Sequence, residues 1–236
     1  MEKDFNYYTN LYGGDKGDNP ICGNHYANYY EPFFKPIQEK VTNICEIGVQ
    51  KGASVKTFQD YFPNAQIIGL DIGDKSQFDT SRITTQILDQ SKPDQLENFV
   101  TQCEKSNVKF DIILDDGSHD VEHQQLTFGK FFKLLKPKGI YVLEDLGTSF
   151  MEVDGVSNVY GNYQTQEKLE NSTLGFLFNR PFSSPWISKD DLDYINQKVK
   201  YISTFDKLNE PPYDHGKIRC LNNMKIRSIT SIIQKK

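Results

Sequence analysis

Two apolar stretches that each end in acidic residues decide the fold: Ile112-Ile-Leu-Asp-Asp-Gly-Ser-His119 and Gly139-Ile-Tyr-Val-Leu-Glu-Asp145. Short apolar runs bounded by Gly and Asp are typical of buried strands in a parallel sheet. Ligands of open α/β sheets bind just beyond the carboxyl ends of the strands. We therefore expect a hard-metal site with a base beside it at one rim of the sheet, made from Asp115, Asp116, Glu144, Asp145 and His119.

Strands and helices alternate on both sides of these stretches. The strands are predicted at Val41–Val49, Gln66–Ile72, Ile83–Leu88, Phe110–Leu114 and Ile140–Leu143. The helices are predicted at Gly52–Phe62, Pro93–Cys103 and Asp120–Leu135, with a turn at residues 136–139. This alternation is typical of a doubly wound, mostly parallel α/β sheet with right-handed crossovers.

The two ends of the chain are less regular. Residues 1–40 are predicted to form an N-terminal helical extension, and residues 41–236 the main domain. Aromatic residues in the extension have helix-like spacing, interrupted by Pro32 and Pro36, which fits either a helix that covers the core or a lid over a ligand. The C-terminal part is predicted as a loop (147–165), helices Gln166–Phe178 and Asp190–Val199, strand Lys200–Thr204, and a terminal strand pair, Lys217–Leu221 and Lys225–Ile233.

Composition excludes some function classes. The net charge is −5 and there is no basic stripe, so binding to nucleic acid through phosphates is disfavoured. No stretch approaches the roughly 18 apolar residues of a membrane span, and the N-terminus does not look like a signal peptide. The four cysteines lack C-x-x-C spacing. We expect a cytoplasmic protein with reduced thiols.

A glycine loop follows the first predicted strand, in Glu46-Ile-Gly-Val-Gln-Lys-Gly52-Ala-Ser54. Its G-x-x-x-G spacing is neither the dinucleotide fingerprint nor a P-loop. Glu46 would repel a pyrophosphate but suits a cationic ligand. Asp71 lies 23 positions after Gly48, where an acid either binds ribose hydroxyls or caps the end of its strand. Asp89, after the third strand, is placed to reach an adenine amino group.

Several of these motifs together resemble a known family. Glu46-Ile-Gly-Val, Tyr61-Phe-Pro-Asn-Ala65, Gly69-Leu-Asp-Ile72, Asp89-Gln90, Asp111–His119 and Tyr141–Leu146 look like the class I S-adenosylmethionine-dependent methyltransferases, and most like the metal-dependent macrocin and mycinamicin-type sugar O-methyltransferases. The likeness covers roughly residues 25–150, and Asp15-Lys16 and His25-Tyr26 are more loosely similar. It implies a Rossmann-like sheet of seven strands.

The resemblance also implies site residues and a reaction. Residues that would contact S-adenosylmethionine are Glu46, Gly48, Gly52, Ser54, Asp71, Asp89, Gln90 and Asp115. Asp116, Glu144 and Asp145 would bind Mg²⁺ or another divalent metal, and His119 would be the general base. The expected reaction is O-methylation of a sugar hydroxyl, on a nucleotide-linked sugar or glycan precursor for a surface polysaccharide. The alternatives are a glycosylated natural product as acceptor, or an NAD(P)-dependent oxidoreductase. A homo-oligomer is a possible assembly.

Simpler interpretations compete for some of these residues. Adjacent acids at a strand end are often solvated turn residues. Ser118 precedes a helix and fits the role of an N-cap. His119 and His123 are four positions apart, which also fits a metal-binding pair on one helix face, although carboxylates suit Mg²⁺ better.

Overall fold

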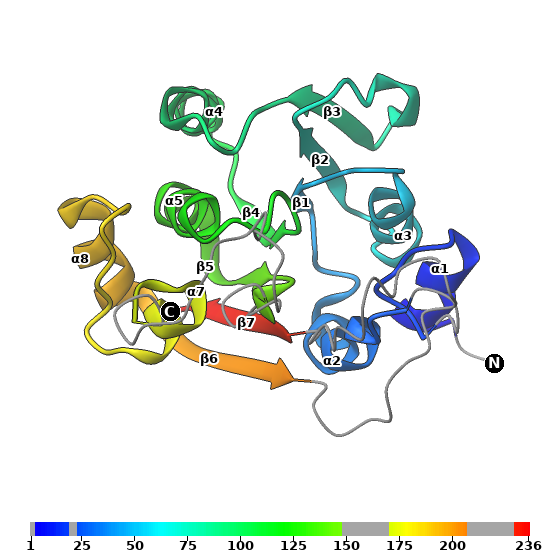
Figure 1. The fold of residues 1–236 in the computed structure, drawn as a ribbon. Helices are drawn as coiled ribbons and strands as arrows, with labels where there is room; N and C mark the ends of the chain where they lie inside the picture. The colour runs from blue at the N-terminus through cyan, green and yellow to red at the C-terminus, as the bar shows by residue number, and fades with distance from the viewer. Residues whose placement is uncertain (1–2, 19–22, 148–169, 207–228) are drawn as a thin grey trace, which may run out of the picture.

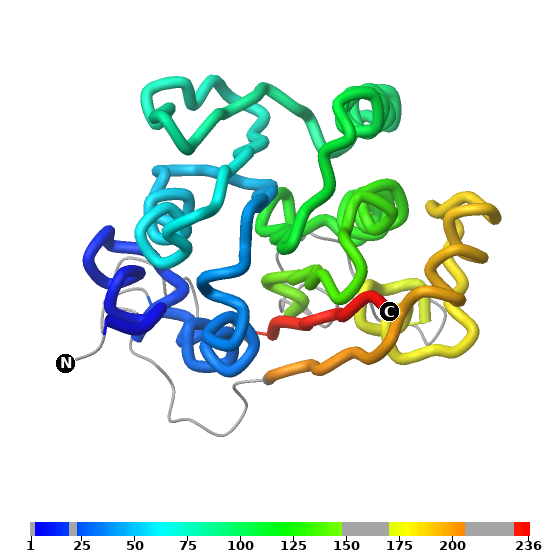
Figure 2. Tube along the Cα trace, turned by 180° about the vertical axis from the view of Figure 1, so that it is seen from behind, coloured from blue at the N-terminus to red at the C-terminus, as the bar shows by residue number. Residues whose placement is uncertain are grey.

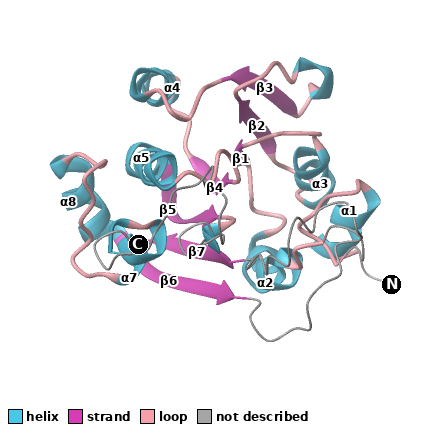
Figure 3. Cartoon of the chain, in the orientation of Figure 1, coloured by secondary structure: helices cyan, strands magenta, loops and turns pink. Residues whose placement is uncertain are grey.

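The structure is a computed structural model that describes residues 3–18, 23–147, 170–206 and 229–236 (Figure 1). These residues form one seven-stranded sheet with helices on both faces, as Figure 3 also shows by secondary structure. Among the described helices, none combines the length and the apolar character that crossing a membrane requires. Residues 148–165 of the predicted loop, residues 166–169 of the predicted helix 166–178 and strand 217–221 lie outside the described residues. The described part of that helix contains α7 (Thr173–Phe178).

The sheet has the strand order β3-β2-β1-β4-β5-β7-β6. Strands β1 to β5 are parallel to one another, and β7 is antiparallel to both of its neighbours. The strands are β1 (Asn43–Ile47), β2 (Gln66–Asp71), β3 (Ile83–Ile87), β4 (Phe110–Asp115), β5 (Leu135–Leu143), β6 (Val199–Asp206) and β7 (Ile229–Lys235). The predicted doubly wound, mostly parallel sheet is confirmed.

The chain order reverses at β1, which lies between β2 and β4. The connections after β1 and β4 therefore leave on opposite faces of the sheet, and a crevice opens between them at the carboxyl ends of the strands. The glycine loop and the Asp115–His119 segment both follow strands that border this crevice. The topology alone thus brings the two motifs together.

Helices cover the two faces of the sheet, and each face has its own hydrophobic core. One face carries α4 (Pro93–Lys105), α5 (Val121–Phe131), α7 (Thr173–Phe178) and α8 (Lys189–Lys198). The other carries α1 (Phe5–Leu11), α2 (Tyr26–Phe34) and α3 (Ala53–Tyr61). Short 3-10 turns lie at Lys35–Ile37, Ser76–Phe78 and Phe132–Leu134. Figure 2, seen from behind, shows the same two helical layers.

The N-terminal helices are part of the core. Phe5, Tyr26, Tyr30 and Phe34 are fully buried and pack in the same cluster as residues of α3 and β1. This agrees with the prediction of a helix that covers the core, and the loop between α1 and α2 also reaches the crevice, as described below. The predicted interruption at Pro32 is wrong, because α2 continues through Pro32 to Phe34 before the 3-10 turn begins.

The prediction for residues 136–139 also needs correction. Residues 136–139, predicted as a turn, lie inside strand β5, where they bulge out between the pairs Phe110–Leu135 and Ile112–Ile140. The left-handed backbone at Lys138 gives that bulge its turn-like character. The predicted terminal strand pair lies outside the described residues up to residue 228, and its described part belongs to β7, which pairs with β5 and β6.

Candidate active site

A cavity of about 850 Å³ lies at the carboxyl ends of β1, β2 and β4 and is closed on one side by the loop between α1 and α2. It is lined by most of the residues that the sequence singled out, namely Gly48, Ser54, Asp71, Asp89, Gln90, Asp116, His119 and Asp145. Gly13, Gly14, Asp15 and Lys16 supply the wall from the N-terminal loop. Glu46, Gly52, Asp115 and Glu144 do not line the cavity.

Only one acid of each adjacent pair faces the cavity. Asp116 and Asp145 line it, whereas Asp115 and Glu144 are both 1% exposed. Each pair lies where its strand ends, and Asp145 has left-handed backbone, so the chain does not present both acids of a pair to the cavity. The prediction that four carboxylates gather at the open rim is therefore wrong in this respect.

The glycine loop passes very close to the loop after β4. Gly48 has a φ of 92°, and a Cβ added to it would lie 2.0 Å from the carbonyl oxygen of Asp116. Only glycine permits this approach. Gly52 has a φ of 74° and begins α3, and its missing side chain makes room for the ring of Phe78 instead of the cavity. Gly52 is thus explained by packing, and contact with a cofactor at this position stays a prediction.

Asp71 holds the glycine loop in place. Its Oδ2 accepts hydrogen bonds from the backbone N–H groups of Val49 (3.0 Å) and Gln50 (2.9 Å), and its Oδ1 accepts one from Gly73 (2.9 Å). The Lys75 ammonium lies 3.7 Å from the carboxylate. Asp71 therefore caps its strand end and also lines the cavity. Capping of the strand end is therefore observed, and ribose binding, the other alternative, remains a proposal.

Glu46 is fully buried next to the cavity. Neither carboxylate oxygen makes a hydrogen bond of ordinary geometry to a described residue. Burial raises the pKa of Glu46 to about 8, and the Lys16 ammonium and the Ser54 hydroxyl offset this only in part. Ionising a buried carboxyl group costs free energy unless a cation or a hydrogen-bond donor contacts it. A cationic ligand in the cavity would therefore favour the ionised form of Glu46.

Asp115 reaches the cavity through Gln90. The Gln90 amide donates to both carboxylate oxygens of Asp115 (2.8 and 2.9 Å), and its own carbonyl oxygen accepts from the backbone N–H of Ser118 (3.0 Å). Burial raises the pKa of Asp115 to about 7. Asp89 turns its Oδ1 back to the backbone N–H of Ser91. Asp115 thus orients Gln90, and Gln90 is the member of the pair that lines the cavity.

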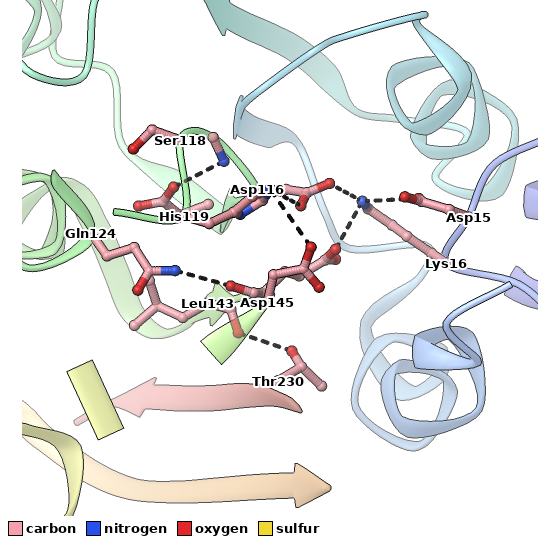
Figure 4. A network of polar contacts seen from close by, with 12 residues as sticks. Asp15, Lys16, Asp116, Ser118, His119, Gln124, Leu143, Asp145 and Thr230 are labelled. Carbon is pink, nitrogen blue, oxygen red and sulfur yellow. Dashed lines mark hydrogen bonds and ion pairs between the residues drawn. The ribbon is translucent and has the colours of Figure 1, made fainter. Parts of the chain in front are cut away.

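Asp116, His119 and Asp145 form the one group of described residues whose ligand atoms lie close enough to hold a metal ion, within 4.8 Å of one another (Figure 4). The Nε2 of His119 lies 3.9 Å from Oδ1 of Asp116 and 3.6 Å from Oδ2 of Asp145. His119 and Asp145 both have left-handed backbone, with φ of 60° and 53°. Such backbone costs energy and is concentrated at functional sites.

Glu144 contacts side chains of the N-terminal segment. Its Oε2 lies 2.9 Å from the ammonium of Lys16, and its Oε1 accepts a hydrogen bond of 2.7 Å from the Tyr30 hydroxyl. Burial raises the pKa of Glu144, and the neighbouring Asp116 carboxylate adds to the effect. Glu144 as a metal ligand stays a prediction.

The donors that face these acids were not predicted from the sequence. Lys16 is 3% exposed, and its ammonium lies 2.5 Å from Oδ2 of Asp116 and 3.8 Å from Asp15. Burial disfavours its charge, but the facing carboxylates outweigh burial and hold the pKa of Lys16 well above its ordinary value. The hydroxyl of Tyr26 donates to Oδ1 of Asp145 at 2.7 Å. The loose likeness at Asp15-Lys16 and His25-Tyr26 was the available signal.

Helix α5 starts later than Ser118. Its N-cap is Asp120, whose side chain accepts from the backbone N–H groups of Glu122 and His123, so the predicted N-cap role of Ser118 is wrong. The Ser118 hydroxyl instead forms a hydrogen bond of 2.9 Å with Nδ1 of His123. His119 precedes the helix, so His119 and His123 do not form a pair on one helix face, and His123 is not in the described metal group.

No family model matches the chain. A tetracenomycin rhamnosyl 2'-O-methyltransferase of Streptomyces olivaceus is 35% identical over 53% of this chain and 34% of its own length. Mycinamicin VI 2''-O-methyltransferase of Micromonospora griseorubida is 30% identical over 64% of this chain and 37% of its own length. Demethylmacrocin O-methyltransferase of Streptomyces fradiae is 34% identical over 53% and 32%, respectively. The chain thus spans about a third of the length of these relatives.

Solved structures give the same fold. The MycE methyltransferase of mycinamycin biosynthesis, solved with Mg, S-adenosylhomocysteine (SAH) and mycinamycin VI, matches with a TM-score of 0.72 at 23% identity, over 100% of this chain and 55% of that one. An O-methyltransferase from Bacillus cereus in complex with SAH matches with a TM-score of 0.52 at 11% identity, over 100% of this chain and 92% of that one. The chain therefore has the fold of the class I S-adenosylmethionine-dependent methyltransferases and is related in sequence to the macrocin and mycinamicin-type sugar O-methyltransferases.

Proposed function

We propose that this chain is an S-adenosylmethionine-dependent, divalent-metal-assisted O-methyltransferase that acts on a sugar hydroxyl of a glycosylated natural product. One observation carries the proposal. The group Asp116, His119 and Asp145 lies on the wall of the same cavity that contains the glycine loop and Asp71. A cofactor pocket, two hard oxygen donors and a proton acceptor thus share one space.

The residues present suit S-adenosylmethionine. The molecule is cationic, and the buried carboxyl of Glu46 beside the glycine loop favours a cation over a pyrophosphate. The close approach at Gly48 leaves backbone rather than side chain at this part of the cavity wall. Asp71 lies where ribose hydroxyls are usually bound. The same features, together with the missing dinucleotide fingerprint, argue against the oxidoreductase alternative.

The donor set also suits a hard divalent cation. Asp116 and Asp145 would hold Mg²⁺ through carboxylate oxygens. Glu144 is the third ligand that the sequence resemblance implies, and its two oxygens are paired with Lys16 and Tyr30. When bound, the ion would act as a Lewis acid that makes a coordinated sugar hydroxyl easier to deprotonate. No further residue is needed to complete an open coordination sphere, because Mg²⁺ ordinarily keeps waters and substrate oxygens among its ligands.

His119 would take the proton of the acceptor hydroxyl. Its Nε2 points toward the two carboxylates, which would stabilise the imidazolium that forms. As the proton moves to His119, the hydroxyl oxygen forms a bond to the methyl carbon, the bond from that carbon to sulfur breaks, and SAH leaves as a neutral thioether. The cavity walls contribute by holding the two reactants in line.

We propose the acceptor class from the relatives. Those relatives methylate glycosylated tetracenomycin, mycinamicin and demethylmacrocin, so we favour a glycosylated natural product over the surface polysaccharide precursor expected from the sequence. Because the chain spans about a third of these proteins, their acceptors carry over only as a class. A cytoplasmic location and a homo-oligomer stay predictions.

Calorimetry on chelator-stripped protein tests the proposal. S-adenosylmethionine, NADH and NADPH are titrated in parallel, with and without Mg²⁺, and methyl transfer is then measured on rhamnosylated and macrolide acceptors. Binding of S-adenosylmethionine alone, with transfer that an excess of chelator abolishes, is the expected result. Binding of only a nicotinamide nucleotide would overturn the assignment of S-adenosylmethionine as the cofactor. Full methyl transfer in the presence of chelator would remove the metal from the mechanism.

A further inference from the structure

Three buried side chains from the N-terminal segment converge on the acids of the candidate active site. Lys16 comes from the loop between α1 and α2, and Tyr26 and Tyr30 come from successive turns of α2. Lys16 is 3% exposed, and both tyrosines are 0% exposed. No role is assigned to them by the chemistry proposed above, yet their polar atoms all end on the carboxylates of Asp116, Glu144 and Asp145.

In Asp116 and Asp145, the two acids that line the cavity, the two carboxylate oxygens have different neighbours. Lys16 pairs with Oδ2 of Asp116, whereas Oδ1 of the same carboxylate faces His119. Tyr26 donates to Oδ1 of Asp145, whereas Oδ2 faces His119. Each N-terminal donor therefore holds one oxygen of a carboxylate, and the other oxygen is turned toward the common space of the metal group. Figure 4 shows Lys16 approaching these acids from the side opposite His119.

The segment that carries Lys16 is itself fixed. The carbonyl oxygen of Lys16 accepts a hydrogen bond of 2.7 Å from the backbone N–H of Ala27, and that of Asp15 accepts one from Asn24. Tyr26 and Tyr30 belong to the buried aromatic cluster of this face of the sheet. The tyrosines thus belong to the packed core, and the backbone of Lys16 is bonded to α2, which gives these donors the fixed placement that a positioning role requires.

We propose that Lys16 and Tyr26 are positioning residues that orient the Asp116 and Asp145 carboxylates for a divalent cation. The inference rests on the metal site of the proposed function and extends it by making the N-terminal segment a structural part of that site. Partners behind metal ligands fix the ligand orientation, and losing one typically weakens metal affinity by about 10- to 100-fold. The competing idea is that the Lys16 ammonium occupies the cation's own place, in which case removing it would strengthen metal binding.

The test is the affinity of the SAH-saturated protein for Mn²⁺, followed by electron paramagnetic resonance of the free ion. Lys16→Met removes the charge and keeps an unbranched apolar side chain that is one atom shorter. Tyr26→Phe removes only the hydroxyl and keeps the packed ring. Lys75→Met is the matched control, because Lys75 lines the same cavity but pairs with Asp71, away from the metal group. The affinity for SAH and a thermal unfolding curve are measured for every variant.

We expect the Mn²⁺ dissociation constant to rise about tenfold or more in Lys16→Met and several-fold in Tyr26→Phe, and to stay within about twofold of wild type in Lys75→Met. Unchanged or tighter Mn²⁺ binding in folded Lys16→Met would overturn the inference while leaving the metal site intact. If Lys16→Met does not fold, Tyr26→Phe decides, and an unchanged affinity there overturns the proposal. A wild-type protein that binds SAH but no Mn²⁺ would overturn the metal role as well.

Discussion

Replacing Glu46 with glutamine should remove a pH-dependent loss of stability. Burial raises the pKa of Glu46 from its ordinary value of 4.5 to about 8 in the folded chain. Between these values the folded state binds more protons than the unfolded state, so the free energy of unfolding falls as pH rises. The contribution of Glu46 is thus fully present below its unfolded pKa and is lost as pH rises through the folded pKa.

The size of the effect follows from the shift. At about 1.4 kcal/mol for each pKa unit, Glu46 should cost the wild type about 2.5 kcal/mol of stability between about pH 6 and about pH 9. Glu46→Gln keeps the shape of the side chain and cannot ionise, so it should lack this loss. The other titrating groups, such as Asp115, are present in both proteins, so the difference between the two curves isolates Glu46.

The assay is urea unfolding of wild type and Glu46→Gln across this pH range, with Glu97→Gln as the control. Glu97 lies on the surface of α4, where the Lys130 ammonium 2.9 Å away lowers its pKa. Its loss should therefore not improve stability at high pH. Parallel curves for wild type and Glu46→Gln would refute the reasoning, because they would mean that Glu46 is already ionised in the folded chain at about pH 6.

The remaining predictions concern the cofactor and the reaction. Because Glu46 holds a proton at neutral pH and a cationic ligand favours its ionised form, S-adenosylmethionine binding near pH 7 should release up to about one proton. Calorimetry in buffers of different ionisation enthalpy measures this release, and a buffer-independent enthalpy would contradict it. His119→Ala should lower kcat by about 10²- to 10⁴-fold and leave cofactor affinity within about twofold, which separates a base from a binding residue. Asp71→Ala should weaken the cofactor more than about tenfold, because the two backbone hydrogen bonds that hold the glycine loop at Val49 and Gln50 are lost. An unchanged dissociation constant would make Asp71 purely structural. Gly48→Ala should destabilise the fold by about 2 kcal/mol or more, seen as a lower Tm, because the new Cβ would lie 2.0 Å from the Asp116 carbonyl oxygen. A wild-type Tm would mean that the loops move apart easily.

The sequence predicted the sheet well because each strand and helix carries its own local signal. The apolar runs that became β1, β2, β4 and β5 end at acids or glycine, and the amphipathic spacing of Pro93–Cys103 falls within α4. Parallel strands need helical crossovers, so the alternation of patterns was enough to specify the topology near the cavity. The errors at residues 136–139 and at Ser118 concern boundaries, where one turn-forming residue is compatible with several local structures.

The sequence by itself determined that an acidic rim, a glycine loop and His119 would meet at the crevice beside β1, because strand ends and chain chirality fix that meeting. Only the tertiary structure decided which acids face the cavity and what holds them. Asp115 and Glu144 are buried, whereas the residues that follow them line the cavity, because each pair lies at the end of its strand, where the backbone leaves extended geometry. Lys16, Tyr26 and Tyr30 reach their carboxylates across 100 or more positions of sequence. Such contacts arise when α2 and the loop before it pack against the sheet, and no local spacing encodes that packing.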